Sequence, residues 1–311
     1  MASGSKKVII AALIGNVMIA VTKFIAALIT GSSAMISEGI HSLVDTGNQV
    51  LLLLGLKKAQ KPPDERFPFG HGKEVYFWSF VVALLLFAMG SGLSIYEGIE
   101  HIRKPAEIHN PALNYIVLSI AIFFEASSCY VAMTEFNKVR GDTDFINSIK
   151  QGKDPAFFVV LFEDIAAMAG LVVALIGITI SHVTGNPVWD GVASLGIGAV
   201  LGFTAIFLAY ETKSLLIGEA ANPEMVRSIR QMISDLPEVS GVNEVLTLHM
   251  GPEFVLVTIS ADFEDNLPVG NIEKVIQQID IRIKQKHPLV KRVFIEAESA
   301  KKKSPEPQAA A

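Results

Sequence analysis

Long apolar stretches dominate the first two thirds of the chain. A helix needs about 20 mostly apolar residues to cross the hydrocarbon core of a bilayer, because no water satisfies the backbone there. Six stretches of the 311-residue sequence reach that length. We therefore predict an all-α membrane domain of six transmembrane helices, which cover approximately 8–30, 34–56, 75–97, 113–134, 156–183 and 191–217.

Lysine and arginine are unevenly distributed among the segments that connect these spans. The leader, the second connection and the fourth connection hold two, five and four of them, whereas the other three connections hold only Arg103 and Lys104. Loops rich in these residues stay on the cytoplasmic side of a membrane. We therefore expect both termini to face the cytoplasm. The short leader has no Arg-rich amphipathic segment, which favours a bacterial inner membrane over an organelle.

The pattern changes near Asn222, where shorter amphipathic and alternating runs replace the long apolar ones. Apolar residues at helical spacing indicate two helices, at 223–233 and 268–286. Runs rich in β-branched and aromatic residues indicate three strands, at 241–248, 254–263 and 292–296. The order α-β-β-α-β predicts a small cytosolic α+β domain of the ferredoxin-like kind, without its usual first strand.

These patterns divide the chain into three parts. We expect the transmembrane domain over 1–220, the ferredoxin-like domain over 221–299, and a disordered tail over 300–311 that is too polar to bury a core. His249, in the Gly-Pro turn between the first two strands, is expected at the surface.

Composition and motifs exclude several classes of protein. The formal net charge of -5 leaves no basic surplus for nucleic acid, so we expect no nucleic-acid partner. A single cysteine, Cys129, excludes an intramolecular disulfide framework and a cysteine-rich zinc module. The sequence has neither the P-loop of an ATP-driven pump nor the HExxH motif of a metalloprotease. Any metal chemistry must therefore use histidine and carboxylates, without ATP hydrolysis.

Several ionisable residues nevertheless fall inside the predicted spans. On insertion scales, one such residue at the centre of a span costs about 2.5 to 3.5 kcal/mol. His41 and Asp45 are four residues apart, which places them on the same face of the second span, and Glu38 lies one turn further back. The remaining acidic residues are Glu125 in the fourth span and Glu163 and Asp164 in the fifth.

One interpretation is that these groups join helices, with Lys23 of the first span as the obvious cation. A single lysine cannot neutralise five carboxylates, however, and an unpaired carboxylate in a membrane is either protonated or binds a cation. A histidine with carboxylates from two helices suits zinc, manganese, iron or cobalt. Metal ligands hold protons when the metal is absent, so such a site can exchange metal for protons, as an antiporter requires.

Two segments carry a resemblance to the cation diffusion facilitators. GSSAMISEGIHSLVD at 31–45 is similar to the family's HxxxD in the second helix, and FPFGHGKE at 67–74 is similar to its FGHGxxE before the third. The Glu-Asp pair of the fifth span and the loop that starts at Arg140 resemble the zinc-transporter-9-like branch. The resemblance covers nearly the whole chain. It implies a homodimeric, proton-coupled exporter of divalent metal, a secondary transporter and no enzyme, with no cofactor and with metal as substrate.

The resemblance also implies ligands. Carried over residue by residue, the transport site contains His41, Asp45 and Asp164, and Val160 stands where most members have a fourth ligand. The missing ligand is a water or one of three acidic side chains, Glu163, Glu125 and Glu38. Metal identity therefore stays open, with zinc first and manganese, iron or cobalt as alternatives.

Two other metal sites of the family are weaker here. Asp64 and His71 match an accessory site of some members, but Phe67 replaces another of its ligands. No histidine stands at the positions that match the regulatory metal ligands of the soluble domain. These positions hold Asn243, Thr258, Glu273, Glu296 and Glu298. We therefore expect this domain to dimerise without a strong zinc site. A metal uniporter or channel and a structural membrane scaffold are the alternative functions.

Overall fold

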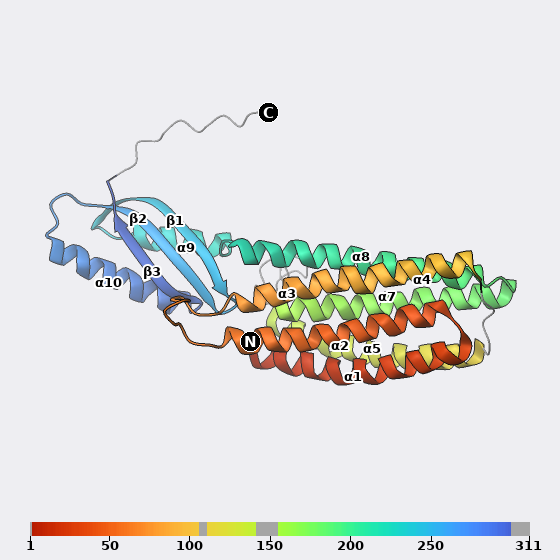
Figure 1. Ribbon diagram of the computed structural model, residues 1–311. Helices are drawn as coiled ribbons and strands as arrows, with labels where there is room; N and C mark the ends of the chain where they lie inside the picture. The colour runs from red at the N-terminus through yellow and green to blue at the C-terminus, as the bar shows by residue number, and fades with distance from the viewer. Residues whose placement is uncertain (1, 106–110, 141–154, 300–311) are drawn as a thin grey trace, which may run out of the picture. The chain divides into compact units, whose positions relative to one another are not determined.

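The long apolar stretches are helices in the structure, a computed structural model that describes residues 2–105, 111–140 and 155–299. The chain divides into two units, one that ends at Leu216 and one that begins at Ile217. Helices α1 to α8 run alongside one another (Figure 1). Their bounds are α1 Ala2–Thr30, α2 Ser33–Ala59, α3 Glu74–Leu85, η1 Leu86–Ser91, α4 Gly92–Arg103, α5 Pro111–Arg140, α7 Pro155–Thr184 and α8 Val188–Ile217.

Five helical segments are long and apolar enough to cross a membrane, judged by length and composition among the described residues. They are Ala12–Thr30, Glu74–Arg103, Ala112–Asn137, Pro155–Thr184 and Val188–Ile217. The helix at the remaining predicted span, α2, is not among the five. It has 27 residues, or about 40 Å at 1.5 Å per residue, but polar side chains are spread along it. The structure therefore shows a helical membrane region with five apolar helices and one long, more polar helix.

The second of these apolar segments is continuous from Glu74 to Arg103 but changes its winding in the middle, where η1 is a π-helical turn. Ser91, at the end of this turn, donates a hydrogen bond from Oγ to the Gly198 carbonyl of α8 at 2.7 Å. Two helical turns beyond Ser91, Gly98 of α4 faces Gly191 of α8. The two backbones are so close that a Cβ on Gly98 would lie 2.8 Å from the Gly191 carbonyl oxygen. Glycine at both positions lets α4 and α8 pack backbone to backbone.

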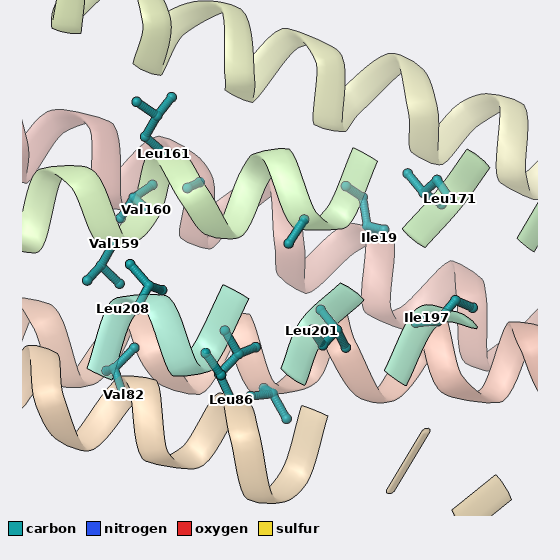
Figure 2. Packing of buried hydrophobic residues seen from close by; sticks show 14 of the residues in the cluster. Ile19, Val82, Leu86, Val159, Val160, Leu161, Leu171, Ile197, Leu201 and Leu208 are labelled. Atoms are coloured by element: carbon teal, nitrogen blue, oxygen red, sulfur yellow. The ribbon is translucent and has the colours of Figure 1, made fainter. Parts of the chain in front are cut away.

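The core of this unit is aliphatic and is shared by α1, α3, η1, α7 and α8, as the labelled side chains of Figure 2 show. Large apolar side chains also cover the outside of the helices. Leu28 is 86% exposed, Val183 81% and Phe203 77%. Such an apolar exterior fits a lipid environment, where no water penalises exposed hydrocarbon.

The second unit contains α9 Pro223–Ser234, β1 Val239–Gly251, β2 Phe254–Phe263, α10 Val269–Lys286 and β3 Val290–Ala297. Its small mixed sheet has the order β1-β2-β3. Strands β1 and β2 form an antiparallel hairpin, whereas β2 and β3 are parallel because α10 connects them. Side chains of α9 and α10, among them Ile229, Ile233, Val275 and Ile279, pack with Val257 of the sheet into one core.

One expectation about this unit was wrong. His249 lies within β1, paired with Val255 of β2, and is only 3% exposed. The strand continues because Val245, Thr247 and His249 alternate onto one face of the sheet, a pattern that extends past the predicted strand end. The predicted tail over 300–311 and the 141–154 part of the loop between the fourth and fifth spans lie outside the described residues.

Candidate metal site

Helix α2 carries a buried polar stripe along one side. Residues three and four apart lie above one another on a helix, so the polar positions of α2 follow one face for about three turns. Each of these side chains is at most 2% exposed, namely Glu38, His41, Ser42, Asp45, Asn48 and Gln49. The stripe therefore faces protein, as expected for side chains that are poorly compatible with lipid.

His41 and Asp45 form a contact within this stripe, as their spacing predicts. The Nε2 atom of His41 lies 3.4 Å from Oδ2 of Asp45, and the two side chains are 0% and 2% exposed. The second carboxylate oxygen of Asp45, Oδ1, has no hydrogen-bond partner among the described residues. Asp45 is thus incompletely satisfied, which costs free energy in a buried site unless a cation or a proton is supplied.

The two acidic residues of α7, Glu163 and Asp164, form hydrogen bonds with two different neighbouring helices. Glu163 accepts a hydrogen bond from Nδ2 of Asn48 on α2 at 2.8 Å. Asp164 accepts one from Oγ of Ser128 on α5 at 2.9 Å. Adjacent residues on a helix point about 100° apart, so this pair connects α7 to both α2 and α5.

Electrostatic interactions join these groups into one cluster. Asp45 interacts with the carboxylates of Glu163, Glu125 and Asp164 and with the ammonium of Lys23. Glu125 of α5 is 1% exposed, and its Oε1 has no hydrogen-bond partner in the described part of the chain. We call Asp45, Glu125, Glu163 and Asp164, together with His41, the acidic cluster.

The acidic cluster is not a preformed coordination sphere. Across residues 2–105, 111–140 and 155–299, no group of three or more His, Cys, Asp or Glu side chains is placed so that it could hold a metal ion. Zinc requires nitrogen and oxygen ligands at about 2.0 to 2.2 Å. The side chains of the cluster must therefore rotate towards one another before they can bind a metal together.

Glu38 is occupied by another partner. Its Oε2 lies 2.9 Å from Nζ of Lys23 on α1, and neither side chain is exposed. The same ammonium donates to Oγ of Ser42 at 2.9 Å. Of the three acidic candidates for the fourth ligand, Glu38 is the one with a cation already bound to it.

The expected accessory site contains only a pair. Nε2 of His71 lies 3.4 Å from Oδ2 of Asp64, whose side chain is 53% exposed. Oδ1 of Asp64 accepts the backbone N–H of Phe67 at 2.7 Å, and the Phe67 ring lies 4.7 Å from the His71 ring. This arrangement closes the loop between α2 and α3 as a packed turn.

In the second unit, a hydrogen-bonded network joins Asn243 and Glu298, two of the positions that match regulatory metal ligands. Asn243 Nδ2 donates to Ser260 Oγ at 3.1 Å, and Ser260 Oγ donates to Glu298 Oε2 at 2.6 Å. The Glu298 carboxylate therefore has a hydroxyl partner within the sheet.

Sequence reasoning missed the neutral partners of the acidic cluster. It considered ionisable residues and so passed over Asn48 and Ser128, which hold Glu163 and Asp164. A signal for Asn48 was present, because it follows Asp45 by three residues and extends the same polar stripe. No comparable signal marks Ser128 among the other small polar residues of its helix.

Comparison with known proteins gives a match over most of the chain. Residues 9–217 match the family model described as the cation efflux transmembrane domain. These residues include every member of the acidic cluster as well as Lys23 and Glu38.

Individual relatives are similar over more than the helical unit. The mitochondrial proton-coupled zinc antiporter SLC30A9 of Mus musculus is 33% identical over 264 residues, which are 84% of this chain and 46% of that protein. Metal tolerance protein C4 of Arabidopsis thaliana is 29% identical over 87% of this chain and 60% of its own length. The cation-efflux pump FieF of Escherichia coli is 25% identical over 83% of this chain and 81% of the pump. The chain thus spans about half the length of the antiporter that it matches.

Proposed function

Because the chain belongs to the cation efflux family, within its zinc-transporter-9-like branch, we propose that it exchanges divalent metal cations, zinc foremost, for protons across a membrane. The observation that carries this proposal is the acidic cluster, which lies inside a helical unit with an apolar exterior. A buried excess of negative charge must be balanced by cations, either metal or protons. The relatives that the chain resembles include a zinc antiporter and a cation-efflux pump.

In this proposal α2 is the sixth membrane span. It lies among α1, α3 and α7, which contact it along its length, so its polar stripe faces helices rather than lipid. Away from this stripe, α2 exposes Leu43, Val50 and Leu54, which give it an apolar surface of its own. Both termini then lie on the same side of the membrane, the side that the lysine-rich connections make cytoplasmic.

His41, Asp45 and Asp164 are the proposed metal ligands, with Glu163 as the fourth. Glu163 is preferred over Glu125 because a hydrogen bond with Asn48 already connects it to α2, the helix that carries His41 and Asp45. Its other carboxylate oxygen, Oε2, has no hydrogen-bond partner among the described residues and is available to the metal. One imidazole and three carboxylates form a borderline-to-hard ligand set, which is compatible with zinc and also with manganese, iron or cobalt.

Proton coupling follows from charge balance in the same cluster. The three proposed carboxylate ligands and Glu125 carry four negative charges when ionised, and the divalent ion supplies two positive ones. In the metal-free state protons take the place of the metal, and metal binding expels them. Alternating exposure of the cluster to the two sides of the membrane converts this competition into antiport.

We further propose that the second unit has a ferredoxin-like fold and joins two copies of the chain. One face of its sheet is covered by α9 and α10, and the other carries Leu246 and Phe294, which are 55% and 46% exposed. These two side chains flank Thr258 in the same row across the three strands. Leu246→Glu should shift the purified protein from dimer to monomer in light-scattering measurements, because it places a charge in that apolar row; a dimer of unchanged stability would contradict this interface.

Reconstitution into liposomes tests the transport function. Vesicles that contain the protein and an acidic interior should take up zinc faster than protein-free vesicles, with manganese, iron and cobalt as competing substrates. Lack of uptake for every metal would overturn the proposal and leave a structural scaffold. Equal uptake with and without the pH gradient would instead indicate a uniporter or channel.

A further inference from the structure

Lys23 is a lysine held inside the helical unit. Its ammonium lies 2.9 Å from Oε2 of Glu38 and 2.9 Å from Oγ of Ser42, both on α2. Within the part of the chain that the structure describes, no other lysine or arginine is buried. The ammonium thus has two partners, whereas Oε1 of Glu38 has no hydrogen-bond partner among the described residues, and a full positive charge stays inside the protein.

This ion pair lies two helical turns along α2 from Asp45 of the acidic cluster. Glu38 precedes Asp45 by seven residues, or about 10 Å along α2. Gly170 follows Asp164 by six residues on the antiparallel helix α7, and a Cβ there would lie 2.6 Å from Oε1 of Glu38. The Glu38 carboxylate is therefore pressed against α7 at the level of Lys23. From this position Lys23 interacts electrostatically with Asp45 and Glu125 of the cluster.

We infer that Lys23 is a tethered cation that keeps Glu38 out of the metal's ligand set and weakens metal binding at the acidic cluster, so that bound metal can leave. The inference rests on the proposed transport function. It removes Glu38 from the candidates for the fourth ligand and gives a non-ligand residue a role in the affinity of the site.

Electrostatics gives the direction of the effect. With Lys23 and Glu38 paired, the two charges largely cancel at the distance of the cluster. If Lys23 alone is removed, the buried Glu38 carboxylate must be balanced by a proton or by the metal about 10 Å away, and its ionised form strengthens metal binding. If Glu38 alone is neutralised, the ammonium has no counter-ion and repels the metal. At an effective dielectric constant of about 20, one unit charge about 10 Å from a divalent ion changes its affinity by roughly a hundredfold or more, and tenfold is the smallest shift expected after screening.

The experiment measures zinc affinity of the purified full-length protein in detergent at pH 8, by competition with a chromophoric chelator. Lys23→Met should tighten zinc binding by at least about tenfold, and Glu38→Gln should weaken it by a similar factor. The double variant should reverse both shifts and lie between the single variants. Lys284→Met removes a lysine from its pair with Asp280 in the second unit, 2.7 Å apart, and serves as a matched control without effect.

Shifts of opposite sign separate this role from a structural one, because loss of packing weakens binding in both single variants. If the two single variants bind within twofold of the unaltered protein, or both bind more weakly, the inference is wrong. If one single variant does not fold, the folded double variant and the other single variant still give the sign. Loss of zinc binding in Asp45→Ala, measured in parallel, shows that the transport site itself is correctly placed even when the Lys23 series has no effect.

Discussion

Asp190 and Asp45 are both acidic residues buried in the helical unit, at 0% and 2% exposed, yet their surroundings differ. Asp190, in the first turn of α8, accepts hydrogen bonds from Oγ of Ser32 at 2.9 Å and from the Ala34 backbone N–H at 3.2 Å. Its Oδ2 also lies 3.3 Å from Nδ1 of His101. Asp45 contacts one imidazole, and other carboxylates surround it.

Under the proposed function, this difference separates a structural carboxylate from a metal ligand. Partners from the α1–α2 turn, the start of α2 and α4 converge on Asp190 of α8, so its charge is compensated by the fold and joins these segments at one end of the unit. Asp45 has one cationic neighbour, Lys23, against three carboxylates, so a metal ion or a proton is needed to complete its charge compensation. A buried acid among other acids therefore indicates a cation site more strongly than burial alone does.

The largest expected effect is on the functional side of this comparison. Asp45→Ala and Asp164→Ala should each lower zinc flux in proteoliposomes by at least about a hundredfold, because each removes a charged ligand that nothing else replaces. Asp64→Ala, in the exposed loop pair, is the control and should leave flux within about twofold. Substantial flux in either cluster variant would mean that the ligands lie elsewhere.

The structural side predicts the reverse outcome. Asp190→Asn keeps the shape of the side chain but removes the charge that several donors share, and should destabilise the protein by about 1.5 to 3 kcal/mol. Thermal unfolding in detergent measures this loss. Zinc affinity of the folded variant should stay close to that of the unaltered protein. A tenfold loss of affinity without loss of stability would place Asp190 in the transport site.

Asn48 sharpens the boundary between the two kinds of site, because it is a neutral donor within the cluster. Asn48→Leu removes the hydrogen bond that holds Glu163 near α2. It should therefore weaken zinc binding by about threefold to tenfold. Asn48→Asp adds a carboxylate to the cluster and should tighten zinc binding. If neither substitution alters affinity, Glu163 is not the fourth ligand.

The smallest effect concerns a titratable group outside the membrane helices. Partial burial, and secondarily the Lys286 ammonium, hold the pKa of the His287 imidazole below its usual value. Its Nε2 lies 3.0 Å from Oγ of Ser228, which connects the end of α10 to α9. Because the unfolded chain then takes up the proton first, stability of the second unit should fall slightly as pH drops below about 6.5. Hydrogen exchange in α9 and α10, corrected for intrinsic rates, measures this, and His287→Gln should remove that part of the pH dependence.

Much of this organisation is predictable from the sequence, for identifiable reasons. Apolar length predicted the position of α2 as well as those of the five apolar helices, although the polar stripe of α2 lowers its hydropathy. The contact of His41 with Asp45 follows from helical spacing. The pairing of Lys23 with Glu38 and of Asn48 with Glu163 does not, because it depends on how different helices pack. His249 shows the same limit in the sheet, where a strand continued through a predicted turn.

The central claim is that the acidic cluster exchanges metal for protons. Its most direct test records zinc and pH together inside proteoliposomes, with the membrane potential clamped and dyes for both ions enclosed. The proposal predicts that zinc entry is accompanied by proton exit, and that both signals disappear in Asp45→Ala. Zinc entry without any proton counterflow would contradict antiport and make the protein a passive route for metal.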